Sequence, residues 1–155
     1  MTTSGDTGQL VAMMNGAMQS TIPIAHKMGV QVVEARPGFA ATTVPADGNG
    51  NHFGVVYAGV LFTVAEVLGG VIALSTFDSA KYFPLVKNVD IEFVGMARSD
   101  LRAEAGLDEQ TIARVGAEAA ERGKADFILE AVVKDAEGQT VATTRGRYQL
   151  RAHGR

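Results

Sequence analysis

The sequence contains no cysteine. This absence excludes disulfide bonds, zinc sites built on thiolates and cysteine nucleophiles, and it fits the reducing cytoplasm that we expect as the location. The chain also lacks an excess of either charge: 14 Lys and Arg against 17 Asp and Glu give a net charge of −3. We therefore expect no nucleic-acid partner. The first residues, MTTSGDTGQL, have neither the basic nor the apolar region of a signal peptide. Because no metal-ligand spacing or phosphate-binding glycine loop occurs, we expect no metal and no cofactor.

What the sequence does have is one long apolar run, from Phe53 to Phe77, with a single ionisable carboxylate, Glu66, near its middle. An ionised carboxylate in an apolar setting is costly unless it is paired, hydrated or functional. Three interpretations compete: a membrane span, a core helix with a structural glutamate, and a core helix with an active-site acid. The run is long enough to span a bilayer, but its glutamate, its glycines and the lack of flanking basic clusters argue against a span. A helix that is apolar on all sides is covered on all sides, so we expect a buried helix.

At this length we expect a single domain over 1–155. Its N-terminal helix is predicted at about 6–20 and its core at about 28–151. Alternating apolar residues and turn signals predict strands before and after the long helix, which spans about Tyr57 to Thr76. The predicted strands cover 28–35, 39–45, 84–96, 100–107, 125–135 and 139–151, and a short helix covers 108–122.

The order of these elements predicts the fold class. Two strands precede the long helix and four follow it, with a short helix inserted, and strands around one buried helix indicate an α+β fold. We predict the hotdog fold, an antiparallel sheet wrapped around a long central hydrophobic helix. One layer of sheet cannot cover such a helix on every side, so we expect a homodimer or a dimer of dimers.

On the long helix, Glu66 lies in a row of small residues that includes Gly59, Thr63 and Gly70. This row suits close packing against the sheet, with the carboxylate bonded to a backbone group. It equally suits a cleft through which a ligand reaches the carboxylate. A buried, unpaired glutamate has a raised pKa and serves as a general base or acid near neutral pH. The residues alone leave both interpretations open.

The beginning of the long helix supplies a second candidate group. Gly54, Ala58 and Gly59 leave backbone N–H groups open to close approach at the positive end of the helix dipole, where an oxyanion can bind. The alternative is that the glycines only allow the loop to turn. About 10 Å of helix separates these donors from Glu66. Either one substrate reaches between them, or the glutamate of a partner chain faces the donors.

The segment around these residues resembles the signature of hotdog-fold acyl-CoA thioesterases of the phenylacetate-pathway type. That signature is Asn-x-x-Gly-x-x-His-Gly-Gly, with an acidic residue seven positions after the last glycine. Asn51, Gly54, Gly59 and Glu66 keep this spacing. The resemblance covers about residues 28–150.

Tyr57 and Ala58 stand where the signature has His-Gly. A branch of thioesterases of largely unassigned function is similar to this sequence in using Tyr-Ala-Gly or a like variant at these positions. The resemblance implies hydrolysis of a thioester carried by coenzyme A or by a carrier protein. It implies that Glu66 is the nucleophile or general base, and that the N–H of Ala58 or Gly59 holds the carbonyl oxygen. Asn51 would orient the water or the carbonyl. The residues expected to contact the substrate are Tyr57, Gly54, Thr63 and Lys87.

Two other functions stay open. His52 precedes Glu66 by 14 residues, as the catalytic His precedes Glu in hotdog hydroxyacyl dehydratases, although the register of Gly59 to Glu66 favours a thioesterase. Tyr57 is a phenol in place of the histidine of the signature, and this difference keeps open an acyl-CoA-binding protein without turnover. Lys87 interrupts the apolar face of its strand, and either reaches a cleft or extends to the sheet edge.

Overall fold

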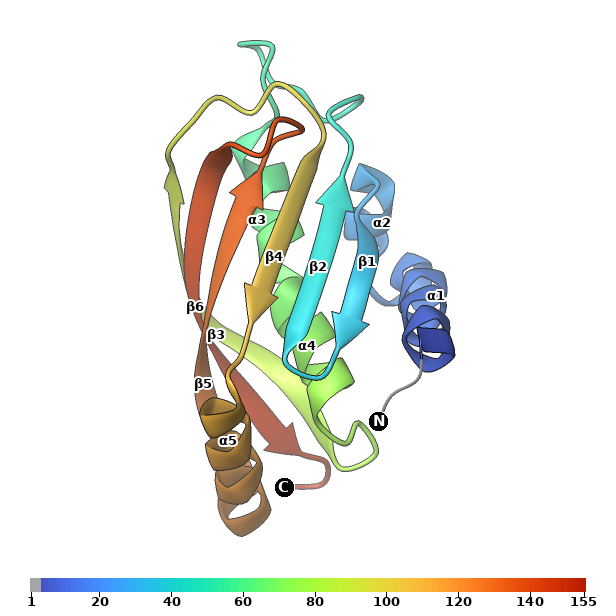
Figure 1. Cartoon of the computed structure of the whole chain (residues 1–155), viewed down its shortest axis with the longest axis vertical. Coiled ribbons are helices and arrows are strands. Elements are labelled where there is room, and N and C mark those ends of the chain that lie inside the picture. Colours follow the sequence, from blue (N-terminus) through green and yellow to red (C-terminus); the bar gives the residue numbers. More distant parts are fainter. Residues whose placement is uncertain (1–3) are drawn as a thin grey trace.

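The computed structural model describes residues 4–155, so residues 1–3 of the predicted domain lie outside the described range (Figure 1). Within this range the helices are α1 (Ser4–Thr21), α2 (Pro23–Met28), α3 (Ala58–Glu66), α4 (Leu68–Thr76) and α5 (Glu109–Arg122). The strands are β1 (Gln31–Arg36), β2 (Phe39–Val44), β3 (Tyr82–Phe93), β4 (Leu101–Gly106), β5 (Lys124–Lys134) and β6 (Thr140–Ala152).

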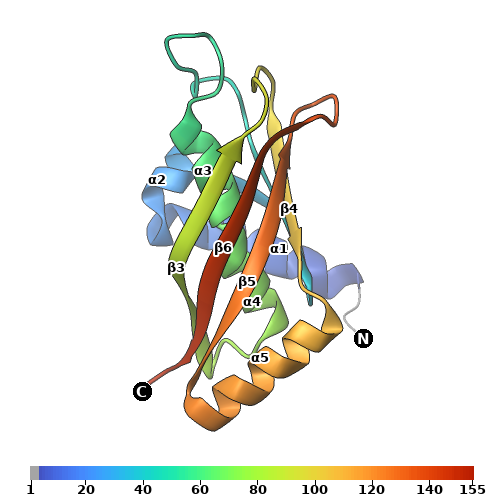
Figure 2. The same cartoon turned by 90° about the vertical axis from the view of Figure 1, so that its left-hand side faces the viewer.

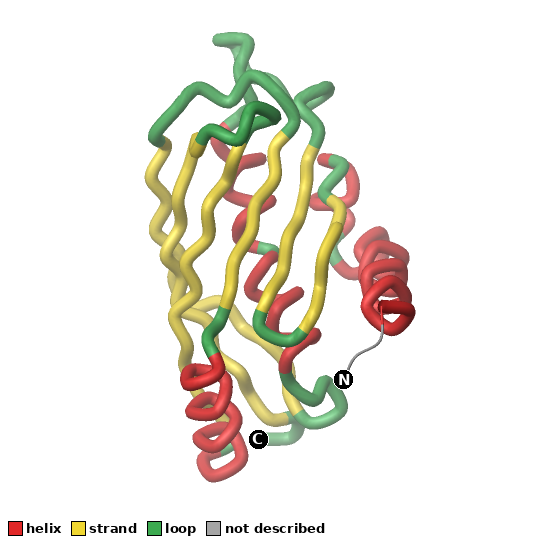
Figure 3. Tube along the Cα trace, viewed as in Figure 1, coloured by secondary structure: helices red, strands yellow, loops and turns green. Residues whose placement is uncertain are grey.

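The strands of residues 4–155 form one antiparallel sheet in the order β1-β2-β4-β5-β6-β3. The sheet curves around α3 and α4, which follow one another along its inner face (Figures 1 and 3). Figure 2 shows β3 at the end of the sheet, beside β6, and α5 below the strands. This arrangement confirms the predicted α+β class and the hotdog fold. Each predicted strand is present, with its ends within three residues of those expected.

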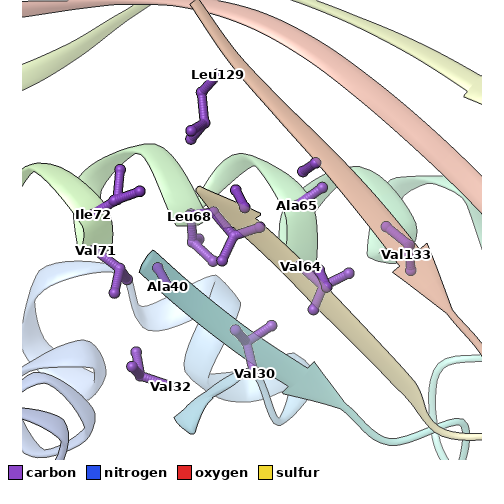
Figure 4. Packing of buried hydrophobic residues seen from close by; sticks show 14 of the residues in the cluster. Val30, Val32, Ala40, Val64, Ala65, Leu68, Val71, Ile72, Leu129 and Val133 are labelled. Atoms are coloured by element: carbon purple, nitrogen blue, oxygen red, sulfur yellow. The ribbon is translucent and has the colours of Figure 1, made fainter. Parts of the chain in front are cut away.

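The central helix packs on the sheet through residues spaced one turn apart. Val64, Leu68 and Ile72 are fully buried, and Figure 4 shows them with Ala40 of β2 and Leu129 of β5. Burying a side chain of this size stabilises the fold by about 1.5–3 kcal/mol. The segment Ala58–Thr76 is long and apolar enough to span a membrane. In this fold, however, it is the core helix on the inner face of the sheet, and its uncovered side leaves Phe62 37% and Leu74 43% exposed.

One helix escaped prediction, because α2 has only six residues and is too short to show a helical period. Its ends nevertheless carry ordinary signals. Pro23 stands in the first turn, where its missing N–H is not needed. Gly29 ends the helix with a left-handed φ of 88°.

The prediction that Lys87 interrupts the apolar face of its strand was wrong. The pairing of β3 with β6 shifts between Val86 and Asn88, so Lys87 is the extra residue of a β-bulge. Val86 pairs with Tyr148, and Val89 pairs with Gly146. Since directly paired residues share a face, the face of β3 toward the helix continues from Val86 to Val89 without the lysine. Simple alternation along the sequence cannot show such a change of phase.

Candidate active site

The central helix is interrupted at the residue that the sequence singled out. α3 ends at Glu66 and α4 begins at Leu68, with Val67 between them. The N–H of Val67 still donates to the carbonyl of Thr63 at 3.1 Å, and the carbonyl of Val67 accepts from Val71 at 3.1 Å. The two helices therefore continue one another, as predicted, apart from this one residue beside the carboxylate.

Glu66 is half-buried and lines a cleft of about 590 Å³. The wall of the cleft is built mainly from apolar side chains of α1, α4 and β3, and its polar members are Thr21, Glu66 and Tyr148. Burial raises the pKa of the Glu66 carboxyl above its ordinary value of 4.5. Within residues 4–155 the carboxylate takes part in no hydrogen bond and no ion pair. The backbone partner that a structural role requires is therefore not found in the described part of the chain, and the arrangement favours the cleft interpretation.

Tyr148 of β6 fixes the main chain of the glutamate, and sequence reasoning missed it. Its hydroxyl donates to the main-chain oxygen of Glu66 at 3.1 Å. Its ring stacks on Phe127 with the centroids 5.7 Å apart. It lies between two glycines: a Cβ on Gly69 would be 1.9 Å from the ring, and one on Gly146 would be 2.6 Å from it. Burial, and then the nearby negative charge of Glu66, raise the pKa of Tyr148 far above its ordinary value, so its hydroxyl stays protonated.

Two neighbouring glycines of α4 serve different purposes. Gly69 makes room for the ring of Tyr148, whereas a Cβ on Gly70 would meet no atom within 4 Å. Gly70 lines the cleft together with Glu66, one turn away. Thr63, in the same predicted row, donates its hydroxyl to the carbonyl of Gly59 at 2.8 Å. Only part of the predicted row of small residues therefore opens onto the cleft.

Two of the three predicted oxyanion donors, Ala58 and Gly59, lie at the start of α3. The prediction was wrong for Gly54, which lies in the preceding loop and whose N–H donates to the carbonyl of Asn51. Tyr57 precedes the helix, and its carbonyl accepts from Val60 and Leu61 at 2.9 and 3.3 Å. The N–H groups of Ala58 and Gly59 have no acceptor within residues 4–155. The ring of Tyr57 lies over Gly59, where a Cβ would be 2.7 Å from the ring. These two N–H groups are therefore available to a ligand, while the small size of Gly59 also accommodates the tyrosine.

Asn51 organises the loop before this helix. Its Oδ1 accepts from the N–H of Phe53 at 2.9 Å and from that of Val55 at 3.3 Å. Gly54 closes the turn with a left-handed φ of 76°, and its N–H donates to the carbonyl of Asn51 at 3.0 Å. The oxygen of the Asn51 amide is thus occupied. Its Nδ2 has no partner among residues 4–155, so this group is the one available to orient a substrate.

The predicted site residues therefore form two groups in one chain. Eight residues separate Ala58 from Glu66, which is about 12 Å along a helix. His52 is exposed, and its ring contacts that of Phe53 at 4.0 Å. Neither His52 nor the exposed Lys87 lines the cleft that holds Glu66. Within residues 4–155 no three His, Asp or Glu residues are placed to hold a metal ion.

A family model described as a domain of unknown function (DUF4442) matches residues 11–150. No curated protein matches the sequence. Among solved structures, a Pseudomonas aeruginosa protein of unknown function, named a probable thioesterase, is 39% identical with a TM-score of 0.85, over 92% of this chain and 95% of that one. A Chlorobaculum tepidum protein of unknown function is 17% identical with a TM-score of 0.81, over 94% and 96%. A Haemophilus influenzae thioesterase is 16% identical with a TM-score of 0.71, over 94% of each chain. At such low identity the last two show the fold alone.

Proposed function

The chain belongs to the DUF4442 family and shares the hotdog fold of structures named as thioesterases, and we propose that it hydrolyses an acyl thioester. The observation that carries this proposal is the half-buried, unpaired carboxylate of Glu66 in the wall of an apolar cleft. Its raised pKa makes it a stronger base than an exposed carboxylate, because its acid form holds the proton more tightly. A general base near an electrophilic carbonyl is what hydrolysis requires.

The distance between the two groups favours a site shared by two chains. Glu66 lies too far along its own helix from the N–H groups of Ala58 and Gly59 to act with them on one carbonyl. In a homodimer, the glutamate of one protomer would face the donors of its partner. The end strand β3 and the residues after it offer an apolar edge for such a contact, since Phe93 is 51% and Met96 is 62% exposed. Unpaired apolar edges of this kind are typical of interaction surfaces.

At a site shared in this way, Glu66 of one protomer would act together with the helix start of its partner. Glu66 takes a proton from water, and the hydroxide adds to the thioester carbon. The oxyanion that forms is held by the N–H groups of Ala58 and Gly59 at the helix start. The C–S bond then breaks, and the thiolate receives the proton from Glu66. The products are a carboxylic acid and a thiol, and Glu66 is again a carboxylate. Asn51 would orient the water or the carbonyl through its Nδ2, and no cofactor is needed.

Glu66 would alternatively act as a nucleophile, attacking the carbonyl itself to form a mixed anhydride that water opens. The two routes differ in the fate of the glutamate oxygens. A single turnover in ¹⁸O-labelled water places the label directly in the product acid if Glu66 is a base. If Glu66 is the nucleophile, water that attacks the acyl carbon of the anhydride labels the acid, whereas attack at the glutamate carbon labels the protein. Label found in Glu66 by mass spectrometry therefore demonstrates the nucleophilic route.

The remaining predicted residues have less direct support. The exposed Tyr57 lies at the helix start, and we propose that it, with Gly54 and Thr63, borders the substrate. Lys87 is exposed on its bulge and would reach only the outer part of the substrate, such as the coenzyme A moiety of an acyl-CoA. Dehydration by His52 has less support, because that ring contacts Phe53 and does not line the cleft. The cytoplasm stays the expected location.

Release of thiol from a panel of acyl-CoA substrates tests the proposal. Glu66→Gln keeps the size of the side chain and removes the base, so turnover should fall by at least about a hundredfold. Glu121→Gln on α5 is the matched control, because that glutamate is exposed and does not line the cleft. Unchanged turnover in Glu66→Gln would refute the role of Glu66. A wild-type protein that binds acyl-CoA and releases no thiol would instead be a binding protein without turnover.

A further inference from the structure

The cleft beside Glu66 extends well beyond what the hydrolysis of a carbonyl needs. Its wall follows the helix from Glu66 past Gly70 to Leu74. Leu74 follows Glu66 by eight positions, which is about 12 Å along the helix. An extended chain advances about 1.2 Å per bond, judged from the reach of an extended backbone, so this length matches about ten bonds. The volume of about 590 Å³ is also that of a ligand-sized site.

Three methionines of α1 contribute to the wall of the cleft. Met13, Met14 and Met18 of α1 all line it, and they are three of the six methionines in the chain. Methionine is unbranched and flexible, and it adapts to irregular apolar partners. Asn15 holds this wall in place, since its Oδ1 accepts from the N–H of Val32 at 2.7 Å and its Nδ2 donates to the carbonyl of Val32 at 2.8 Å.

The chemistry of the wall restricts the ligand. Among residues 4–155, no basic side chain lines the cleft, so these residues offer no partner for a phosphate or for a second carboxylate. The aromatic ring of Tyr148 in its wall is already stacked on Phe127. Besides Glu66 and Tyr148, the described part of the wall has one polar side chain, that of Thr21, to bind a hydroxyl group on an aromatic acyl group. These features suit a flexible aliphatic chain and not an aromatic acyl group.

We propose that the cleft binds the acyl group of the substrate, and that this group is an unbranched aliphatic chain of about 8–12 carbons, from the length of the cleft. The thioester carbon lies at Glu66, and the tail runs along α4 against the methionines of α1. The exposed Met13 covers the rim. This inference rests on the proposed hydrolysis for the position of the thioester, but binding of the chain can be measured without turnover.

Gly70 allows the cleft to be blocked without disturbing the core. A Cβ there would meet no atom within 4 Å, and leucine forms helices better than glycine, so Gly70→Leu should fold and fill the cleft. Gly116→Leu is the matched control. Gly116 lies in α5, a Cβ there also meets nothing within 4 Å, and it does not line the cleft.

The experiment is calorimetric titration with acetyl-, butanoyl-, octanoyl- and dodecanoyl-CoA in a Glu66→Gln background, which removes turnover. Affinity should rise by about fourfold for each methylene that becomes buried, up to the length of the cleft. Gly70→Leu should lower the affinity for dodecanoyl-CoA by at least about a hundredfold more than the affinity for acetyl-CoA, because several methylenes can no longer be buried. Gly116→Leu should leave the series unchanged.

Affinities that do not depend on chain length in the Glu66→Gln protein overturn the inference, and this result needs no further variant to fold. Retained dodecanoyl-CoA affinity in Gly70→Leu also overturns it. If light scattering shows that Gly70→Leu changes the mass of the assembly, the cleft belongs to a second copy of the chain and the inference is wrong. Thiol release by the wild type separates the two proposals. If affinity depends on chain length but no thiol is released, hydrolysis is refuted and binding of the acyl chain in the cleft is supported. If thiol is released but affinity does not depend on chain length, hydrolysis is supported and binding of the acyl chain in the cleft is refuted.

Discussion

Replacing Gly69 by alanine is expected to destabilise the protein, whereas the same change at Gly70 is expected to stabilise it. The added methyl group at Gly69 would lie 1.9 Å from the ring of Tyr148. That ring has nowhere to move, because Gly146 contacts its other edge, Phe127 stacks on its face and its hydroxyl bonds to the helix. At Gly70 the methyl group would meet nothing within 4 Å.

The magnitudes follow from three contributions. Alanine in place of glycine within a helix gains about 0.5–1 kcal/mol, which is the whole effect expected at Gly70. At Gly69 the overlap with the ring costs up to about 3 kcal/mol, and moving the ring also loses the hydroxyl bond, worth about 1 kcal/mol. The net expectation at Gly69 is a loss of about 2–3 kcal/mol, so the two variants should differ by about 2.5–4 kcal/mol.

Urea unfolding followed by circular dichroism measures this difference, with all variants at one protein concentration because assembly affects apparent stability. With a slope of about 2 kcal/mol per molar urea, the two midpoints should lie about 1.2–2 M apart. The effect should disappear in a Tyr148→Ala background, where Gly69→Ala has no ring to displace. If the two alanine variants have equal midpoints, or if the midpoint of Gly70→Ala is lower than that of Gly69→Ala, the packing around Tyr148 is not as described.

The raised pKa of Glu66 predicts that turnover increases with pH through a value above 4.5, and a rate that is flat from pH 4 to 8 contradicts this. The native carboxyl holds its proton more tightly than the unfolded one, so stability should fall as pH rises from about 4.5 through the folded pKa, and Glu66→Gln should lack this fall in urea unfolding. Ala58→Pro should lower turnover by about two to three orders of magnitude, because it deletes an oxyanion donor at a position where the extended Tyr57 (ψ 140°) tolerates a following proline. Mixing this variant with Glu66→Gln should restore about a quarter of the wild-type rate, since half of the dimers are mixed and each has one intact site; no recovery means that the site lies within one chain. Tyr148→Phe should lower the free energy of unfolding by about 1 kcal/mol and also slow turnover, and a variant equal to wild type in both would remove Tyr148 from the site.

Local patterns in the sequence predicted the strands, the long central helix, α1 and α5, but missed the short α2. Leu101, Ala103 and Ala105 alternate along β4 and are all buried, and the apolar helix from Ala58 lies along the inner face of the sheet. Burial on one face imposes a period of two on a strand, and burial over most of its surface leaves a helix almost without polar residues. Both effects can be recognised from residues that are close together in the sequence. The isolated position of Glu66 in that helix was therefore visible without any structure.

The tertiary structure decided the contacts between residues that lie far apart in the chain. Tyr148 follows Glu66 by 82 residues, and only the pairing of β6 within the sheet brings its hydroxyl to the helix. The same pairing distinguishes Gly69 from Gly70 and removes Lys87 from the apolar face through a bulge. The sequence by itself determined the fold class and the candidate carboxylate, because these depend on local periodicity. Which groups surround the carboxylate depends on strand register and helix rotation, which are set by packing between elements and not by any one segment.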